Sequence, residues 1–173
     1  MASTNKTPHL RLNQWVGTDP VLRTDFNFDN NRLDAEVNAR ALLRLTGTTL
    51  SAGAASIPLD LLDYELAQYA ALQLYLRPMT SGEAVVTLRV NEETPVQLAA
   101  MAADGSRGLV IHLCLLPGGV GGWWFAPGGT GTTSGSFRVP GVGAADLASL
   151  TLACVGAATF RKGSGVSLYG IKK

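Results

Sequence analysis

The stretch Ala70–Asn91, AALQLYLRPMTSGEAVVTLRVN, decides the fold, because it holds two strand-like runs on either side of a turn. Apolar residues alternate with polar or amphipathic ones in both runs, at Leu72, Leu74 and Leu76 and again at Val86, Leu88 and Val90. A two-residue period places alternate side chains on opposite faces of a strand, so each run predicts a half-buried β-strand. Ser81-Gly82 between the runs predicts a hairpin turn.

Similar runs recur at short intervals on both sides of this stretch, with Gly, Pro, Asn and Asp between them. The predicted strands are Leu42–Thr49, Ala70–Pro78, Ala84–Asn91, Val96–Ala100, Leu109–Leu116, Trp123–Ala126, Ser136–Val139, Ser149–Val155, Ala158–Arg161 and Ser164–Ile171. Such spacing is typical of a sandwich or barrel. We therefore expect residues 41–173 to form a mostly β domain, an antiparallel, jelly-roll-like β-sandwich. Ile57–Tyr69 is expected to be a loop or a single helical turn that enters a core strand.

Residues 1–40 have a different pattern and are expected to form a separate segment. Pro8, Gly17 and Pro20 exclude a helix or a long central strand from its first half, which is expected to be extended. That half still carries spaced apolar residues, at Leu10, Leu12, Trp15, Val21 and Leu22. An extended segment with such residues does not stabilise itself, so we expect it to lie against its own domain or a neighbouring protein.

The second half of this segment predicts one short helix over Asp25–Asn38, with Thr24 or Asp25 as its N-cap. One narrow stripe follows from helical spacings of four, three and four, at Phe26, Asn30, Leu33 and Val37. A stripe this thin suits packing against symmetry mates or a partner, or light docking on the sandwich.

Composition excludes several classes of function. The chain has 173 residues, with 14 Lys plus Arg against 13 Asp plus Glu, so its net charge does not indicate nucleic-acid binding. No apolar run is long enough for membrane insertion. The polar N-terminus does not resemble a secretory signal, which predicts synthesis in a cytoplasm. Charged residues make up only 16% of the chain, which suggests that other subunits cover part of its surface.

The residues that usually carry chemistry form no convincing set, so we expect no catalytic site, metal or cofactor. The candidates weighed are His9, His112, Cys114, Cys154, Asp60, Asp63, Glu65, Glu92 and Glu93. No G-x-S-x-G elbow is present, the cysteines match no zinc or redox spacing, and the acids resemble ordinary turn residues. A small glycan hydrolase would need two facing carboxylates, which the sequence does not identify.

The glycine-rich stretch Pro117–Gly135, PGGVGGWWFAPGGTGTTSG, is predicted to be a long loop that carries three consecutive aromatics. Trp123, Trp124 and Phe125 are therefore candidate ligand-binding residues. Successive residues of an extended chain point to opposite faces, so one of the two tryptophans should be exposed or lie at a subunit contact. A carbohydrate-binding, receptor-recognising module would show this loop in a groove rimmed by residues such as Arg77, Gln97 or Asn91.

The run Thr7–Trp15 (TPHLRLNQW), followed by Asp19–Asn27 (DPVLRTDFN) and Asp29-Asn30, resembles the N-terminal segment of tailed-bacteriophage and prophage fibre or appendage proteins. The resemblance covers about the first fifth of the chain. It implies a virion structural protein, a fibre, baseplate or head-decoration subunit, with its N-terminus attached to the particle and its C-terminal domain projecting.

What the resemblance implies for residues is an attachment or trimer-forming role for Trp15, Phe26, Asn27 and Leu33. With the apolar anchors of the segment, the expected attachment or oligomer interface is Leu10, Leu12, Trp15, Phe26, Asn27, Leu33 and Val37. The expected partners are the chain itself, as a homotrimer, other virion proteins of tail, baseplate or capsid, and a host cell-surface glycan. The expected location is the virion, after synthesis in the bacterial host cytoplasm.

Overall fold

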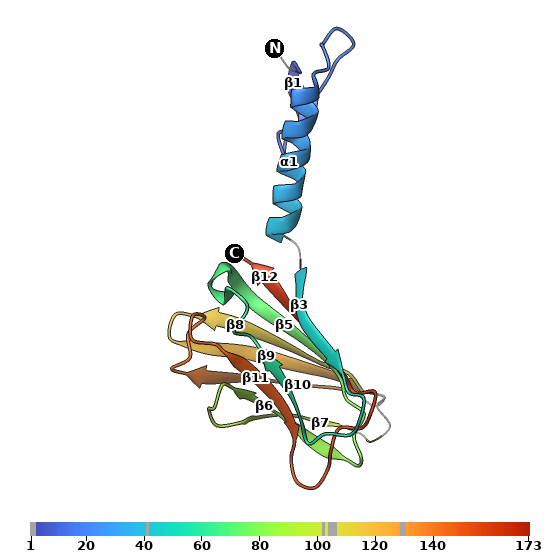
Figure 1. Ribbon diagram of the computed structural model, residues 1–173, viewed down its shortest axis with the longest axis vertical. Helices are drawn as coiled ribbons and strands as arrows, with labels where there is room; N and C mark the ends of the chain where they lie inside the picture. The colour runs from blue at the N-terminus through green and yellow to red at the C-terminus, as the bar shows by residue number, and fades with distance from the viewer. Residues whose placement is uncertain (1–2, 41, 102, 104–106, 129–130) are drawn as a thin grey trace. The chain divides into compact units, whose positions relative to one another are not determined.

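The computed structural model describes residues 3–40, 42–101, 103, 107–128 and 131–173 and divides into two compact units, Met1–Ala41 and Leu42–Lys173 (Figure 1). The N-terminal unit consists of β1 (Asn5–Lys6), β2 (Asn13–Gln14) and the helix α1 (Arg23–Arg40). The second unit consists of β3 (Leu42–Thr49), β4 (Ser56–Asp60), a 3₁₀ turn (Leu66–Gln68), β5 (Tyr69–Arg77), β6 (Ala84–Val90), β7 (Val96–Met101), β8 (Leu109–Leu116), β9 (Gly119–Gly128), β10 (Gly131–Pro140), β11 (Ser149–Cys154) and β12 (Gly165–Lys172).

The second unit is an antiparallel β-sandwich with jelly-roll strand order. One sheet has the order β10-β9-β8-β5-β12-β3 and the other β4-β11-β6-β7. Without β9 and β10, the first of eight strands pairs with the last, the second with the seventh, the third with the sixth, and the two middle strands pair with each other. This nested antiparallel pairing across two sheets is the jelly roll. The β9–β10 hairpin extends the larger sheet beyond β8.

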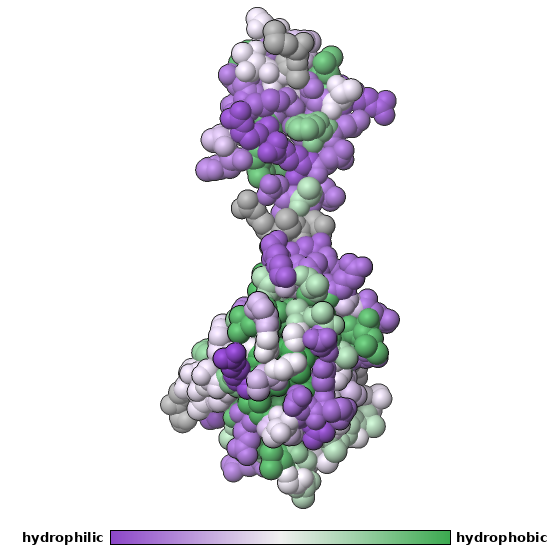
Figure 2. All heavy atoms as spheres, turned by 90° about the vertical axis from the view of Figure 1, so that its left-hand side faces the viewer, coloured by the Kyte–Doolittle hydropathy of each residue, from purple (hydrophilic) through white to green (hydrophobic). Residues whose placement is uncertain are grey.

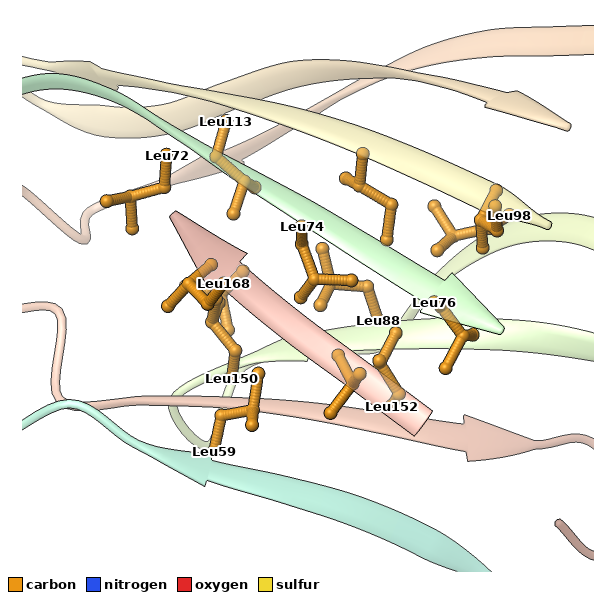
Figure 3. Packing of buried hydrophobic residues seen from close by; sticks show 14 of the residues in the cluster. Leu59, Leu72, Leu74, Leu76, Leu88, Leu98, Leu113, Leu150, Leu152 and Leu168 are labelled. Carbon is orange, nitrogen blue, oxygen red and sulfur yellow. The ribbon is translucent and has the colours of Figure 1, made fainter. Parts of the chain in front are cut away.

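The alternation in the sequence fills the space between the two sheets. In Figure 3 leucines from both sheets point toward one another, among them Leu74 of β5, Leu88 of β6 and Leu152 of β11, each fully buried. The sequence prediction that Leu72, Leu74, Leu76 and the apolar residues of the second run share buried faces is confirmed. Burying these faces provides the main driving force for the fold.

The predicted hairpin at Ser81-Gly82 is wrong, because β5 and β6 lie in different sheets. The chain crosses from one sheet to the other over residues 78–83. Thr80, which is fully buried, forms a single bridge with Phe160 there. That bridge, together with one between Phe160 and Ala54, is what the structure has in place of the predicted strand Ala158–Arg161. Both β5 and β6 alternate regularly, so their pattern alone did not tell which strand pairs with which.

Two further expectations need correction. Ile57–Tyr69 was expected to be a loop or helical turn, but its first part belongs to β4, an outer strand of the smaller sheet. The later part does contain a single 3₁₀ turn. The stretch Pro117–Gly135 is not a long loop, because its described residues form most of the β9–β10 hairpin; residues 129–130 lie outside the described part of the chain.

Two inward-facing glycines of this hairpin lie directly under aromatic rings. A Cβ on Gly135 would lie 2.8 Å from the Trp124 indole, and one on Gly122 would lie 2.9 Å from the Phe137 ring. Each glycine is the direct cross-strand partner of the aromatic residue that covers it. The glycines therefore provide room for aromatic rings against a strand, which is a packing role and not loop flexibility.

Candidate functional site

In the N-terminal unit, the segment before the helix folds back and is held against α1 by Asn13. The Asn13 backbone N–H donates to Asp29 Oδ2 at 2.8 Å, and its side-chain Nδ2 donates to Asp29 Oδ1 at 2.9 Å. The Asn13 Oδ1 atom accepts bonds from Ser3 Oγ and Lys6 Nζ. Both Asn13 and Asp29 are buried, so this pair acts as the polar lock of the unit.

Trp15 lies beside this lock and stacks on Phe26 of the helix, with ring centroids 4.9 Å apart. The expectation of a segment without long strands is met, since β1 and β2 have two residues each. The helix begins at Arg23 and extends to Arg40, so Thr24 and Asp25 lie inside its first turn and neither is the expected N-cap. Within the described residues, Trp15 Nε1 and Asp25 Oδ2 are buried side-chain atoms without a hydrogen-bond partner.

The helix buries a polar face and exposes apolar side chains. The buried or half-buried face follows helical spacings of four, three and four, at Asp25, Asp29, Arg32 and Glu36. The exposed apolar residues of the helix are Phe26, Phe28 (55% exposed), Leu33 (37%) and Val37 (66%). This is the reverse of a helix that packs on its own core. On the face that Figure 2 shows, apolar side chains stand among mainly hydrophilic ones over this unit.

Of the predicted interface residues, Phe26, Asn27, Leu33 and Val37 are exposed on the helix. Leu10, Leu12 and Trp15 are half-buried in the folded-back segment. Sequence reasoning missed the lock, although Asn13 and Asp29 both belong to the quoted resemblance. Neither residue stands out in the sequence, because Gln14 follows Asn13 and Asp29 lies among asparagines.

In the jelly roll, the outward face of the larger sheet gathers aromatic side chains. Trp123 (47% exposed) and Phe125 (38%) both point outward from β9. The expectation that the two tryptophans face opposite ways is confirmed, because Trp124 packs against the core. The exposed pair is therefore Trp123 with Phe125, and not the adjacent tryptophans.

The strand register places these aromatics in two neighbouring rows across all six strands. One row reads Arg44, Tyr169, Gln73, His112, Trp123, Ser136, and the other reads Gly47, Ser167, Tyr75, Val110, Phe125, Ser134. His112 stacks on Trp123 with ring centroids 5.2 Å apart and 16° between the planes. Tyr75 and Tyr169 meet edge to face at 5.6 Å. His112 is therefore half-buried and belongs to the same aromatic surface as Trp123.

A groove of about 290 Å³ lies on the same face, beside Tyr75. Two arginines line it, Arg44 of β3 and Arg77 of β5, together with Ser167 of β12. Gly47 keeps it open, because a Cβ there would lie 2.7 Å from an Arg44 guanidinium nitrogen and 3.1 Å from Ser167 Oγ. The groove therefore combines two cationic donors with a hydroxyl and an aromatic wall.

The smaller sheet carries a separate groove of about 520 Å³ on its outward face, which includes Arg89, Gln97 and Cys154 in its lining. Burial raises the pKa of the Cys154 thiol and so favours its neutral form. The three rim residues expected around the aromatics are separated. Arg77 shares their sheet, Gln97 lies on this other one, and Asn91 braces a turn by accepting from the backbone N–H groups of Ala148 and Ser149.

Other kinds of site find little support in the described part of the chain. No group of three or more His, Cys, Asp or Glu side chains there could hold a metal ion. The cysteines are free and lie in different sheets, which excludes the disulfide that adjacent strands would have allowed. None of the described helices combines the length and apolarity needed to cross a membrane.

Comparison with known proteins finds no matching family model, no matching curated protein and no matching solved structure.

Proposed function

We propose that the chain is a virion appendage subunit that attaches to its particle through the N-terminal unit and presents the jelly roll. The observation that carries this proposal is the inverted helix α1. Its polar face is covered by the chain's own folded-back segment, while Phe28, Leu33 and Val37 remain exposed. The proposal that the particle is a virion rests on the resemblance of residues 7–30 to phage fibre and appendage proteins.

Physical chemistry supports a covered state for this helix. One helix and a hairpin whose strands have two residues each bury too little apolar surface to be stable alone. Covering the exposed apolar residues of the helix would add the missing burial. The unpaired buried atoms Trp15 Nε1 and Asp25 Oδ2 would also gain from a partner, since a buried unpaired polar group costs about 1–3 kcal/mol.

The first partner in this proposal is the chain itself, as a homotrimer. Phe26, Asn30, Leu33 and Val37 alternate by four, three and four residues, which is the spacing of a coiled-coil seam. A single asparagine in such a seam selects one register, because any other register would bury its amide against apolar side chains. Trimerisation would leave Phe28 and the folded-back segment for contact with other virion proteins.

Substitutions on the exposed stripe test the proposal without touching the lock. Leu33→Asp with Val37→Asp places two carboxylates in the seam, while Asn31→Asp, exposed on the same helix, is the matched control. Light scattering on a size-exclusion column should give a trimer mass for the wild type and the control and a monomer mass for the double variant. Mass spectrometry of purified particles should find the wild-type chain and not the double variant. A monomeric wild type would refute the trimer, and incorporation of the double variant would refute attachment through this stripe.

A second candidate function, carbohydrate recognition, is favoured by one specific observation. Trp123, Phe125 and His112 form one exposed aromatic surface on a rigid sheet. Flat aromatic surfaces of this kind accept the apolar faces of sugar rings, with polar rim groups setting orientation. An appendage that carries such a surface could bind a host glycan.

A further inference from the structure

The larger sheet differs from the rest of the chain in its charge. Its six strands contain no aspartate or glutamate, although the chain has 13. Three arginines lie on the outward face of these strands. Arg44 and Arg77 line the groove, and Arg138 lies opposite Gly121 on β10. The aromatic surface is therefore bordered by positive charge, and no strand of this sheet carries a carboxylate that would neutralise it.

The groove and the aromatic surface are continuous. Tyr75 lines the groove, and the register places Tyr75, Val110 and Phe125 side by side on three adjacent strands. Two strand spacings separate Tyr75 from Phe125, which is about 10 Å along the sheet. A chain of linked sugar rings could thus lie on the aromatics and still reach the arginines.

We propose that this face binds an acidic glycan, with sugar rings stacked on Trp123 and Phe125 and a sugar carboxylate held between Arg44 and Arg77. The proposal rests on the carbohydrate-recognition candidate and specifies its ligand class. Guanidinium groups bind carboxylates through paired, charge-assisted hydrogen bonds, and the absence of strand carboxylates removes internal competitors for them. Ser167, in the same groove, supplies a hydroxyl for a sugar hydroxyl.

A second copy of the chain fits this face less well. In a two-fold contact the same surface meets itself, so the interface would hold the arginines of both copies. The six strands of either copy offer no carboxylate to pair with them. An acidic ligand has the complementary charge.

The experiment uses the full chain on an array of carboxylated bacterial polysaccharides, each printed beside its carboxyl-reduced counterpart. Reduction converts the carboxylate to an alcohol and leaves the sugar backbone in place. We expect at least one carboxylated polysaccharide to be bound and its reduced counterpart to bind roughly tenfold more weakly, the loss that removing a charge-assisted bond produces. Binding should also weaken as salt is raised.

Three variants assign the binding to this face. Trp123→Ala removes the stacking surface, and Arg77→Gln removes one cation from the groove and retains a polar side chain. Arg89→Gln is the matched control, because Arg89 lines the groove of the other sheet. We expect the first two variants to lose roughly tenfold in binding and the control to keep it. Thermal melts check that all three remain folded.

The outcomes distinguish the acidic ligand class from carbohydrate recognition, the function on which it rests. The proposal is supported if glycan binding weakens on carboxyl reduction of the polysaccharide and in Trp123→Ala and Arg77→Gln, but not in Arg89→Gln. Equal binding to reduced polysaccharides, sensitive only to Trp123→Ala, overturns the acidic class and leaves carbohydrate recognition standing. No glycan binding, or binding that none of the variants changes, overturns both. A fall in molecular mass with Trp123→Ala alone would make the occupant a second copy and overturn the proposal.

Discussion

Replacing each of two adjacent tryptophans by alanine should destabilise the jelly roll to different extents. Trp123 and Trp124 are neighbours on β9, so Trp123→Ala and Trp124→Ala remove the same side chain from the same strand. What β-propensity scales mainly measure is side-chain packing and burial, so the two variants report the packing on each face of the strand. What differs is the face, since Trp124 packs on the core and over Gly135, while Trp123 points outward.

The structure provides a magnitude for each variant. Truncating a core tryptophan to alanine costs roughly 3–5 kcal/mol, and Trp124 keeps some exposure, so we expect about 3 kcal/mol. Trp123 is 47% exposed and stacks on His112. An aromatic stack contributes about 0.5–1.5 kcal/mol beyond the area that it buries, and the buried half of Trp123 adds to this, so we expect about 2 kcal/mol for Trp123→Ala. The predicted difference in the free energy of unfolding is about 1 kcal/mol.

Urea denaturation followed by far-ultraviolet circular dichroism measures this difference without depending on tryptophan fluorescence. With a slope of about 2 kcal/mol per molar urea, the midpoint of Trp124→Ala should lie about 0.5 M below that of Trp123→Ala. Equal midpoints would contradict the assignment of the two indoles to opposite faces. A lower midpoint for Trp123→Ala would reverse it and remove the aromatic surface from the outside of the sheet.

Two predictions concern the N-terminal unit. Asp29→Ala should release the folded-back segment, because it leaves two buried donors of Asn13 unpaired, at a cost of about 1–3 kcal/mol each. Amide hydrogen exchange in residues 3–19 should then rise sharply, while the jelly roll keeps its melting temperature. Hydrogen bonds from the Thr4 hydroxyl, then from the Thr4 and Val16 amides, hold the pKa of Asp19 below its ordinary value of 3.8. Because the folded pKa is the lower one, this contact contributes stability above the ordinary value and loses it as pH falls through the folded value. The Thr4 amide signal in an NMR titration should therefore have its midpoint below pH 3.8, and a change centred above that value would contradict the contact.

Several features of this protein could be predicted from residues alone. The leucines of β5 alternate with polar side chains, and a two-residue period has one structural meaning, a strand with one buried face. The same rule placed Trp123 and Trp124 on opposite faces before either face was known. The fold class, most of the strand positions, the presence of the helix and the opposite orientations of the two tryptophans were in this sense local properties.

Other features depended on contacts between distant residues. The alternation of β5 and β6 is equally compatible with a hairpin and with an arch between sheets, and only the pairing of β5 with β8 and β12 decided it. Glycines in β9 and β10 predict flexibility until the rings that lie over Gly122 and Gly135 are known. The polarity of α1 predicts nothing about which face is covered until Asn13 meets Asp29. Within the sandwich, sequence thus determined which strand residues avoid water, because that preference belongs to each side chain. Tertiary structure decided which of them meet, because pairing is a property of the whole chain.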